Sequence, residues 1–195
     1  MRFLRTLAAM AALLLLTGCL PVLTQTPVGT TAGLANDPAL YGVWKGKNPD
    51  DKDQRDAMFH FMRAKDGGFD IVVVMAEGGA DDGWTALTGT SSKLGQNHFL
   101  NVVMTYDKAG PVEGRLKGAT IALLYRVEGR TLTLYQMSET AAKAAIKSGQ
   151  IQGTIAPGDD GDVTITAGAQ ELDAFLAKPE AVKLFQPMLV LRKAN

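Results

Sequence analysis

Short apolar segments alternate with turn residues along the chain from Tyr41 onward. Segments of this length, bounded by Gly, Asp and Asn, are typical of an antiparallel all-β domain. Asp66-Gly67-Gly68 separates two such segments and Glu128-Gly129 separates another two, which indicates hairpins because glycine adopts positive φ without steric cost. We predict strands over residues 41–45, 58–65, 69–76, 84–94, 98–106, 120–128, 131–137, 151–156, 163–166 and 188–192.

The order of polar and apolar positions within two of these strands indicates what each face contacts. In residues 120–128 the odd positions are apolar, whereas Arg126 and Glu128 lie among the even positions. This alternation predicts one buried face and one mostly solvated face. Residues 69–76 are nearly apolar on both faces, which predicts a strand that is covered on both sides or whose second face lines a cavity.

Two segments depart from the strand pattern and carry helix signals. Ser138 is suited to cap the N-terminus of a helix that Gly149 ends. A second helix over residues 169–177 has an apolar stripe on one side. We expect these two short helices to lie between the late strands, followed by a further helical turn over residues 180–186.

The first residues of the chain have the pattern of a signal peptide. Arg2 and Arg5 precede an apolar run over residues 7–16, which is too short to span a bilayer comfortably. The run ends in Leu16-Thr17-Gly18-Cys19, which resembles the lipobox of bacterial lipoproteins. The resemblance implies that the Cys19 thiol forms a thioether to diacylglycerol, that the chain is cut before Cys19, and that the new α-amine is acylated, with palmitate as a common chain.

This resemblance assigns the protein to the bacterial cell envelope, with a lipid anchor in the membrane. Because Leu20 rather than Asp follows Cys19, it implies the periplasmic face of the outer membrane if the host is Gram-negative. Two other interpretations remain open: an ordinary secretory signal cleaved elsewhere, and an uncleaved anchor in which the Cys is incidental. Two or more acyl chains anchor a protein stably, whereas one chain binds weakly.

Charge and cysteine content narrow the partners and cofactors. The chain has 195 residues with 20 basic and 20 acidic side chains, and removal of residues 1–18 takes away two Arg, so the mature chain carries 18 − 20 = −2. We therefore expect no binding to nucleic acid. A single Cys excludes an internal disulfide, a multi-Cys zinc site and an iron–sulfur cluster.

The chain divides into a signal peptide, a tether and one domain. Residues 20–37 are rich in Thr, Pro and Gly and show no periodicity, which predicts a flexible tether. Random-coil scaling over this length would place the domain about 20–25 Å from the membrane. We expect residues 1–18 to be the signal peptide, 19–38 to be the lipidated Cys and tether, and 39–195 to be a single β-rich domain.

Gly42-Val43-Trp44, at the start of the first predicted strand of the domain, resembles the Gly-x-Trp motif of lipocalin-like barrels. The resemblance implies a mainly β fold in which an antiparallel meander closes into a barrel, with Trp44 at its closed end. It also implies that a cation from the last strand packs across Trp44, for which Arg192 is the candidate and Lys193 is its neighbour. Another type of β-barrel or a two-sheet sandwich is the alternative.

Few residues suggest catalysis. His60 and His98 are the two His of the chain, and each lies in a predicted strand, where a partly buried structural role is more common. The acidic stretches at residues 50–56 and 159–162 lack the spacing of a calcium loop and read as solvated turns. Residues 77–83 read as a long hairpin loop. We expect no enzymatic activity, no catalytic residue, no metal site and no cofactor.

The apolar strand positions favour a binding function. A barrel of about eight strands is just wide enough to be filled by side chains or to hold one small ligand. We expect either a barrel that binds a small apolar or amphipathic ligand, or a structural module with a filled barrel that docks another envelope protein. The candidate pocket residues are Phe59, Phe61, Ile71, Val73, Met75, Leu100, Val102, Leu123 and Tyr125.

The lipid anchor can be tested at Cys19. We expect mass spectrometry of the mature protein to show lipid on Cys19. Cys19→Ser should lose both this lipid and the membrane fractionation, because the serine hydroxyl does not form the thioether to diacylglycerol. If Cys19→Ser fractionates like the unchanged protein, the predicted anchor is wrong.

Overall fold

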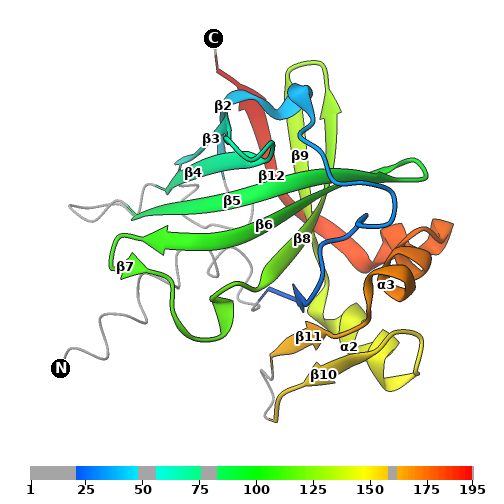
Figure 1. The fold of residues 1–195 in the computed structure, drawn as a ribbon. Coiled ribbons are helices and arrows are strands. Elements are labelled where there is room, and N and C mark those ends of the chain that lie inside the picture. The colour runs from blue at the N-terminus through cyan, green and yellow to red at the C-terminus, as the bar shows by residue number, and fades with distance from the viewer. Residues whose placement is uncertain (1–20, 48–55, 76–82, 158–161, 195) are drawn as a thin grey trace.

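Eight antiparallel strands close into a barrel in the computed structural model, which describes residues 21–47, 56–75, 83–157 and 162–194 (Figure 1). Each strand pairs with the next one along the chain, and the last strand returns to pair with the first. This confirms the predicted mainly β fold and its closed meander. The barrel strands are β2 (Gly42–Lys47), β3 (Asp56–Arg63), β4 (Phe69–Met75), β5 (Gly83–Leu94), β6 (Asn97–Asp107), β8 (Thr120–Glu128), β9 (Thr131–Met137) and β12 (Phe185–Lys193).

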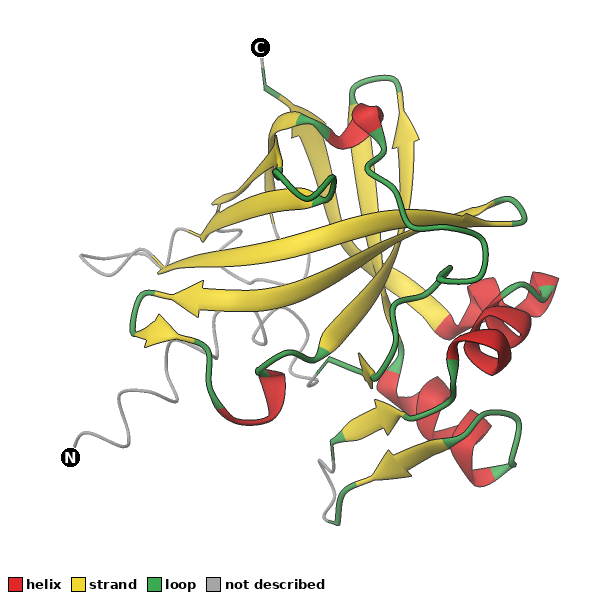
Figure 2. Cartoon of the chain, viewed as in Figure 1, coloured by secondary structure: helices red, strands yellow, loops and turns green. Residues whose placement is uncertain are grey.

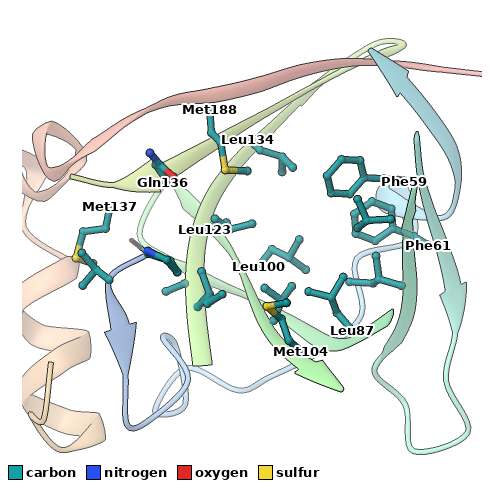
Figure 3. Close-up of a pocket in the computed structure, with 17 residues that line it drawn as sticks. Phe59, Phe61, Leu87, Leu100, Met104, Leu123, Leu134, Gln136, Met137 and Met188 are labelled. Atoms are coloured by element: carbon teal, nitrogen blue, oxygen red, sulfur yellow. The ribbon is translucent and has the colours of Figure 1, made fainter. Parts of the chain in front are cut away.

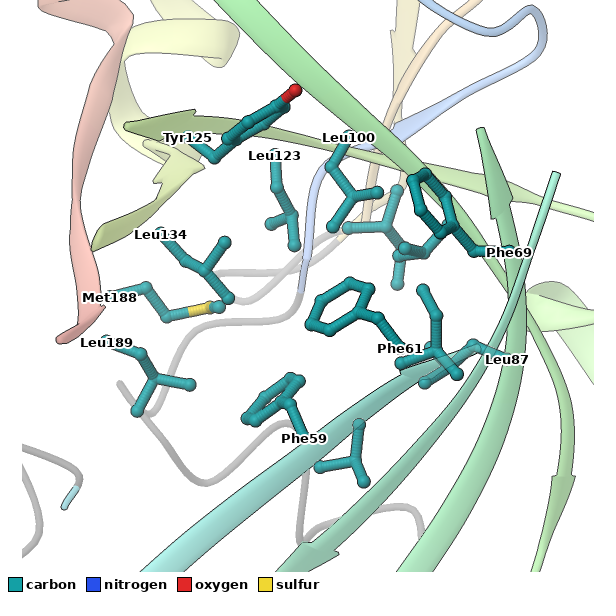
Figure 4. Close-up of a cluster of buried hydrophobic side chains, with 14 of the residues drawn as sticks. Phe59, Phe61, Phe69, Leu87, Leu100, Leu123, Tyr125, Leu134, Met188 and Leu189 are labelled. Atoms are coloured by element: carbon teal, nitrogen blue, oxygen red, sulfur yellow. The ribbon is translucent and has the colours of Figure 1, made fainter. Parts of the chain in front are cut away.

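Side chains on alternate positions of these strands fill the barrel. In β4, Ile71 and Val73 are buried and lie opposite Phe61 and Phe59 of β3. The intervening position Val72 is half-buried on the outer wall. The predicted strand over residues 69–76 therefore has one face in the core and one partly covered face. Figure 4 shows the aromatic and aliphatic side chains meeting inside the barrel.

A 3-10 helix and an aromatic side chain close one end of the barrel. Trp44 is fully buried, and its indole Nε1 donates a 2.7 Å hydrogen bond to the Leu40 carbonyl of η1 (Pro38–Leu40). The Nζ of Lys193 lies 5.0 Å from the centre of the Trp44 ring system. A closed end built on Trp44 is therefore present, and a cation from the last strand packs on it.

The cation is Lys193, and the prediction of Arg192 is wrong. Lys193 lies opposite Trp44, whereas Arg192 lies opposite Lys45 and is exposed. Successive side chains of a strand point to opposite faces, so only one of two neighbouring cations can point inward. Leu191, two positions before Lys193, is fully buried on the same face.

Two hairpin strands and two helices are inserted between β9 and β12 and lie together beside the barrel (Figure 2). The predicted helices are confirmed, and the Ser138 Oγ accepts a hydrogen bond from the Ala141 N–H at the first helix. The strands predicted near residues 151–156 and 163–166 pair with each other outside the barrel. The elements are α2 (Glu139–Lys147), β10 (Gly153–Ile155), β11 (Val163–Ile165), α3 (Ala169–Leu176) and η3 (Pro179–Leu184).

A second hydrophobic core forms between this insertion and the outer wall of the barrel. Phe99 of β6 and Leu124 of β8 point outward into it, and the rings of Phe99 and Phe185 lie 5.7 Å apart. The first six residues of β8 are therefore buried on both faces. The prediction that one face of residues 120–128 is solvated is therefore wrong for residues 120–125, because the insertion covers the outer face of the strand there. From Arg126 onward the prediction holds.

The N-terminal segment packs on the protein. Within it, β1 (Leu23–Thr24) pairs with both β8 and β11, so that Leu23 lies opposite Ile121 on one side and Thr164 on the other. Val22, Leu23 and Val28 are buried. The prediction of a flexible tether is therefore wrong for residues 21–37, and the folded body begins well before residue 39.

Between β6 and β8 the chain adds β7 (Gly110–Pro111) and η2 (Gly114–Leu116).

Buried polar side chains hold this segment in place. The carboxylate of Asp173, which is 4% exposed, accepts hydrogen bonds from the Gly29 N–H at 2.6 Å, the Thr31 N–H at 2.8 Å and the Thr31 hydroxyl. Asn101 accepts from the Val28 N–H and donates to its carbonyl. Gly29 has a φ of +85°, and a Cβ there would collide with the neighbouring β5 side chain. The composition of residues 20–37 indicates a loop, but it does not reveal these distant partners.

Asp173 provides a test of this attachment. We expect Asp173→Ala to lower the free energy of unfolding by about 3 kcal/mol, because it leaves buried backbone N–H groups of the N-terminal segment without their charged acceptor. Urea unfolding measures the change. Asp70→Ala, at an exposed position of β4, should stay within about 0.5 kcal/mol. Equal effects of both substitutions would contradict a specific role for Asp173.

Candidate functional site

An apolar cavity lies inside the barrel, with lining residues from β3 and β4 on one side and from the end of β9 on the other (Figure 3). Seven of the nine predicted pocket residues line it, each from the inward face of a barrel strand. These seven are Phe59, Phe61, Ile71, Val73, Leu100, Val102 and Leu123.

The other two predicted residues belong to the same core but do not line the cavity. Met75 is the last residue of β4 and lies opposite Ala57 and Gly83, at the end of the barrel away from Trp44. Tyr125 is buried toward the other end, where its hydroxyl donates a 2.7 Å hydrogen bond to Asp37 Oδ2. This bond directs the Tyr125 hydroxyl away from the cavity.

Several lining residues were not among the sequence candidates. Ile121 could have been found, because it shares the inward parity of Leu123 in the same predicted strand, and Leu134 could have been found because it alternates with Leu132 on the apolar face of the next strand. Pro21 and Val22 could not, because they come from the segment predicted as a tether. The remaining lining residues are Leu87, Met104, Ala122, Gln136, Met137 and Met188.

The size of the cavity limits what it can hold. Its volume is about 60 Å³, whereas the envelope that includes the solvent at its mouth is about 800 Å³. The volume of about 60 Å³ limits the size of a ligand, because the rest of the envelope is open to solvent. A water molecule needs about 10–15 Å³ by the same measure, so the cavity would hold about four to six waters. A narrow ligand such as part of an alkyl chain fits this space, and a large fused ring system does not.

The lining is apolar except at one position. Gln136, near the end of β9, is the polar side chain among the lining residues, and it lies opposite Leu123. Met104, Met137 and Met188 contribute flexible, polarisable side chains to the lining from three different strands. The cavity therefore suits an apolar body with a polar group near Gln136, and the methionines can adjust to its shape.

The two His and the acidic stretches that we considered for catalysis or metal binding do not line this cavity or lie outside the described residues. His60 is exposed on the outer face of β3, and the His98 ring packs edge-on against Tyr125 at 5.5 Å. Across the described ranges, no three His, Cys, Asp or Glu side chains gather where they could hold a metal ion. Asp56 pairs with Lys47, and Asp162 pairs with Arg115.

Cys19, the acidic stretches at residues 50–55 and 159–161, and the loop at residues 77–82 lie outside the described residues.

The Tyr125–Asp37 hydrogen bond connects the core to the closed end. Burial raises the pKa of Tyr125 far above its ordinary value, and the hydrogen bond to Asp37 and the charge of that carboxylate raise the pKa further. Tyr125 therefore stays protonated and keeps donating to Asp37. Asp37 in turn caps η1 by accepting from the Ala39 N–H at 2.9 Å. The bond thereby stabilises the helix that covers Trp44.

No protein-family model, curated protein or solved structure matched this chain in three separate comparisons.

Tyr125 makes the stability sensitive to alkaline pH. Its folded-state pKa is raised, so its contribution is complete below pH 10 and decreases above it, where only the unfolded state releases the proton. The loss should approach about 1.4 kcal/mol per pH unit. Urea unfolding between pH 9 and 11 should show a steeper decline for the unchanged protein than for Tyr125→Phe. Identical slopes would contradict a buried, protonated hydroxyl.

Proposed function

We propose that this protein is a lipid-anchored, non-enzymatic protein of the bacterial cell envelope that binds a small apolar or amphipathic ligand inside its barrel. The observation that carries this proposal is the apolar cavity, whose single polar lining side chain is Gln136. Ligand sites in proteins are typically concave and mostly apolar, with a small number of polar groups that orient the ligand.

The small volume and the apolar lining of the cavity favour a single alkyl chain as the ligand. A volume of about 60 Å³ accepts only a few carbon atoms unless side chains move. Met104 and Met188 are unbranched and could move to lengthen the space. A carboxylate, hydroxyl or ester near Gln136 would then be the polar end of the ligand.

The anchor part of the proposal rests on the lipobox-like residues Leu16-Thr17-Gly18-Cys19. A lipid anchor makes the membrane one partner of the protein. In a Gram-negative host, it would hold the protein at the periplasmic face of the outer membrane. Separately, among the described residues, no helix has the length and apolar character needed to cross a membrane.

Native mass spectrometry can test ligand binding directly. A chain that starts at Leu20 should retain an apolar molecule after detergent-free purification, and it should bind decanoic acid after that molecule is removed. Leu100→Phe, which narrows the cavity, should weaken decanoic acid binding at least tenfold, because the added ring atoms occupy the ligand space.

Leu132→Phe is the matched control. Leu132 is fully buried in the same barrel core but does not line the cavity, so this substitution should change binding less than twofold. If neither a retained molecule nor decanoic acid binding is found, the barrel is filled, and a structural or protein-docking module replaces this proposal.

A further inference from the structure

The predicted anchor is separated from the folded body by very little chain. Pro21 lines the cavity, and Cys19 precedes it by only two residues. Two residues span at most about 7 Å even when fully extended. Because residues 21–37 are packed rather than free, a lipid on Cys19 holds this part of the protein at the membrane surface.

Pro21 lies near the end of the barrel opposite Trp44. Neighbouring strands run in opposite directions, so this end is formed where β3, β5 and β8 begin and where β4, β6 and β9 finish. Leu23 pairs with Ile121, the second residue of β8, which places the N-terminal segment at this same end. We refer to it as the open end.

Two exposed aromatic side chains lie at the open end. Trp84 is the second residue of β5 and is 43% exposed, and Tyr106 is the penultimate residue of β6 and is 50% exposed. They lie on adjacent strands, because Tyr106 pairs with Ala86, two residues after Trp84. Large exposed apolar side chains are otherwise few in the described ranges, where Leu34 and Val190 complete the set.

Apolar residues of the neighbouring strands continue this surface. Trp84 lies opposite Val74, and Val74 lies opposite Met58. A second row runs from Tyr106 through Ala86 and Val72 to the exposed His60. We call the apolar and aromatic residues of these two rows the wall patch: Met58, Val72, Val74, Trp84, Ala86 and Tyr106. Lys45 extends the first row beyond Met58 and supplies a cation.

We propose that the wall patch rests on the lipid bilayer, with Trp84 and Tyr106 at the level of the headgroups. This inference rests on the anchored, ligand-binding function proposed above, and it adds that the ligand enters the barrel from the membrane. Trp and Tyr are the side chains most enriched at membrane interfaces, since each combines an apolar ring with a polar group. Lys45 is suited to lipid phosphate.

The short link to Cys19 favours a membrane over a protein as the occupant of this surface. A lipid on Cys19, two residues before Pro21, would bring the open end to the bilayer. A surface that binds a partner protein would instead have to point away from the bilayer. The cavity reaches the same end through Pro21, Gln136 and Met188. An alkyl chain could then pass from the bilayer into the barrel without crossing bulk water.

The two Trp of the chain allow a direct test. Trp44 is fully buried, whereas Trp84 is 43% exposed, so Trp84 reports on the wall patch. The full lipoprotein is reconstituted in phosphatidylcholine vesicles whose acyl chains carry bromine close to the headgroup. We expect bromine to reduce the Trp84 emission at least twofold. In Trp84→Phe, in which only Trp44 emits, bromine should leave the emission unchanged.

Other outcomes overturn the proposal. Unquenched Trp84 that iodide reaches from water would show that the wall patch stands away from the bilayer. Unquenched Trp84 that iodide does not reach would show that a second copy or another protein covers it. A mature protein without lipid mass would remove the anchor and this inference together, whereas a lipidated protein that binds decanoic acid but shows no bromine quenching would remove only this inference.

Discussion

Pairing of the first and last barrel strands is the constraint on which the rest of the structure depends. Once β12 lies against β2, every barrel strand has two partners, and the sheet closes around the apolar interior. The closure also brings Lys193 opposite Trp44, where η1 covers the end of the barrel. One end is thereby closed by protein, and the apolar cavity can continue only toward the other end. The position of the site follows from this closure.

Much of this architecture could be predicted from local patterns. The glycine-containing turn at Gly129 and the flanking alternation are sufficient to place β8 and β9, because hairpin register follows from the turn. The candidate from the Gly-x-Trp resemblance, Arg192, differs by one residue from the cation on Trp44, although the buried Leu189 and Leu191 already carry the inward parity to Lys193. The alternation of inward-facing positions along β12 therefore indicates which cation contacts Trp44 better than the type of the charged side chain does.

The N-terminal segment shows what local patterns cannot provide. Its composition is that of a loop, yet Val28 is fully buried, and its backbone is bound by Asn101, 73 residues away along the chain. Asp173 binds the next residue, Gly29, across 144 positions. Such polar partners depend on the complete fold, so no window of sequence contains them. The same limitation explains why Val22 was not recognised as part of the cavity wall.

This segment gives the barrel and the insertion a common boundary. Leu23 belongs to the barrel core and Val22 to the second core, so β1 separates two hydrophobic clusters while pairing with a strand of each. The cavity reaches this boundary, since Val22, Ala122 and Met137 line it together with residues inside the barrel. A ligand that enters here would contact both cores. If Cys19 carries the proposed lipid anchor, the described residues nearest to it, Pro21 and Val22, are also residues of the cavity wall.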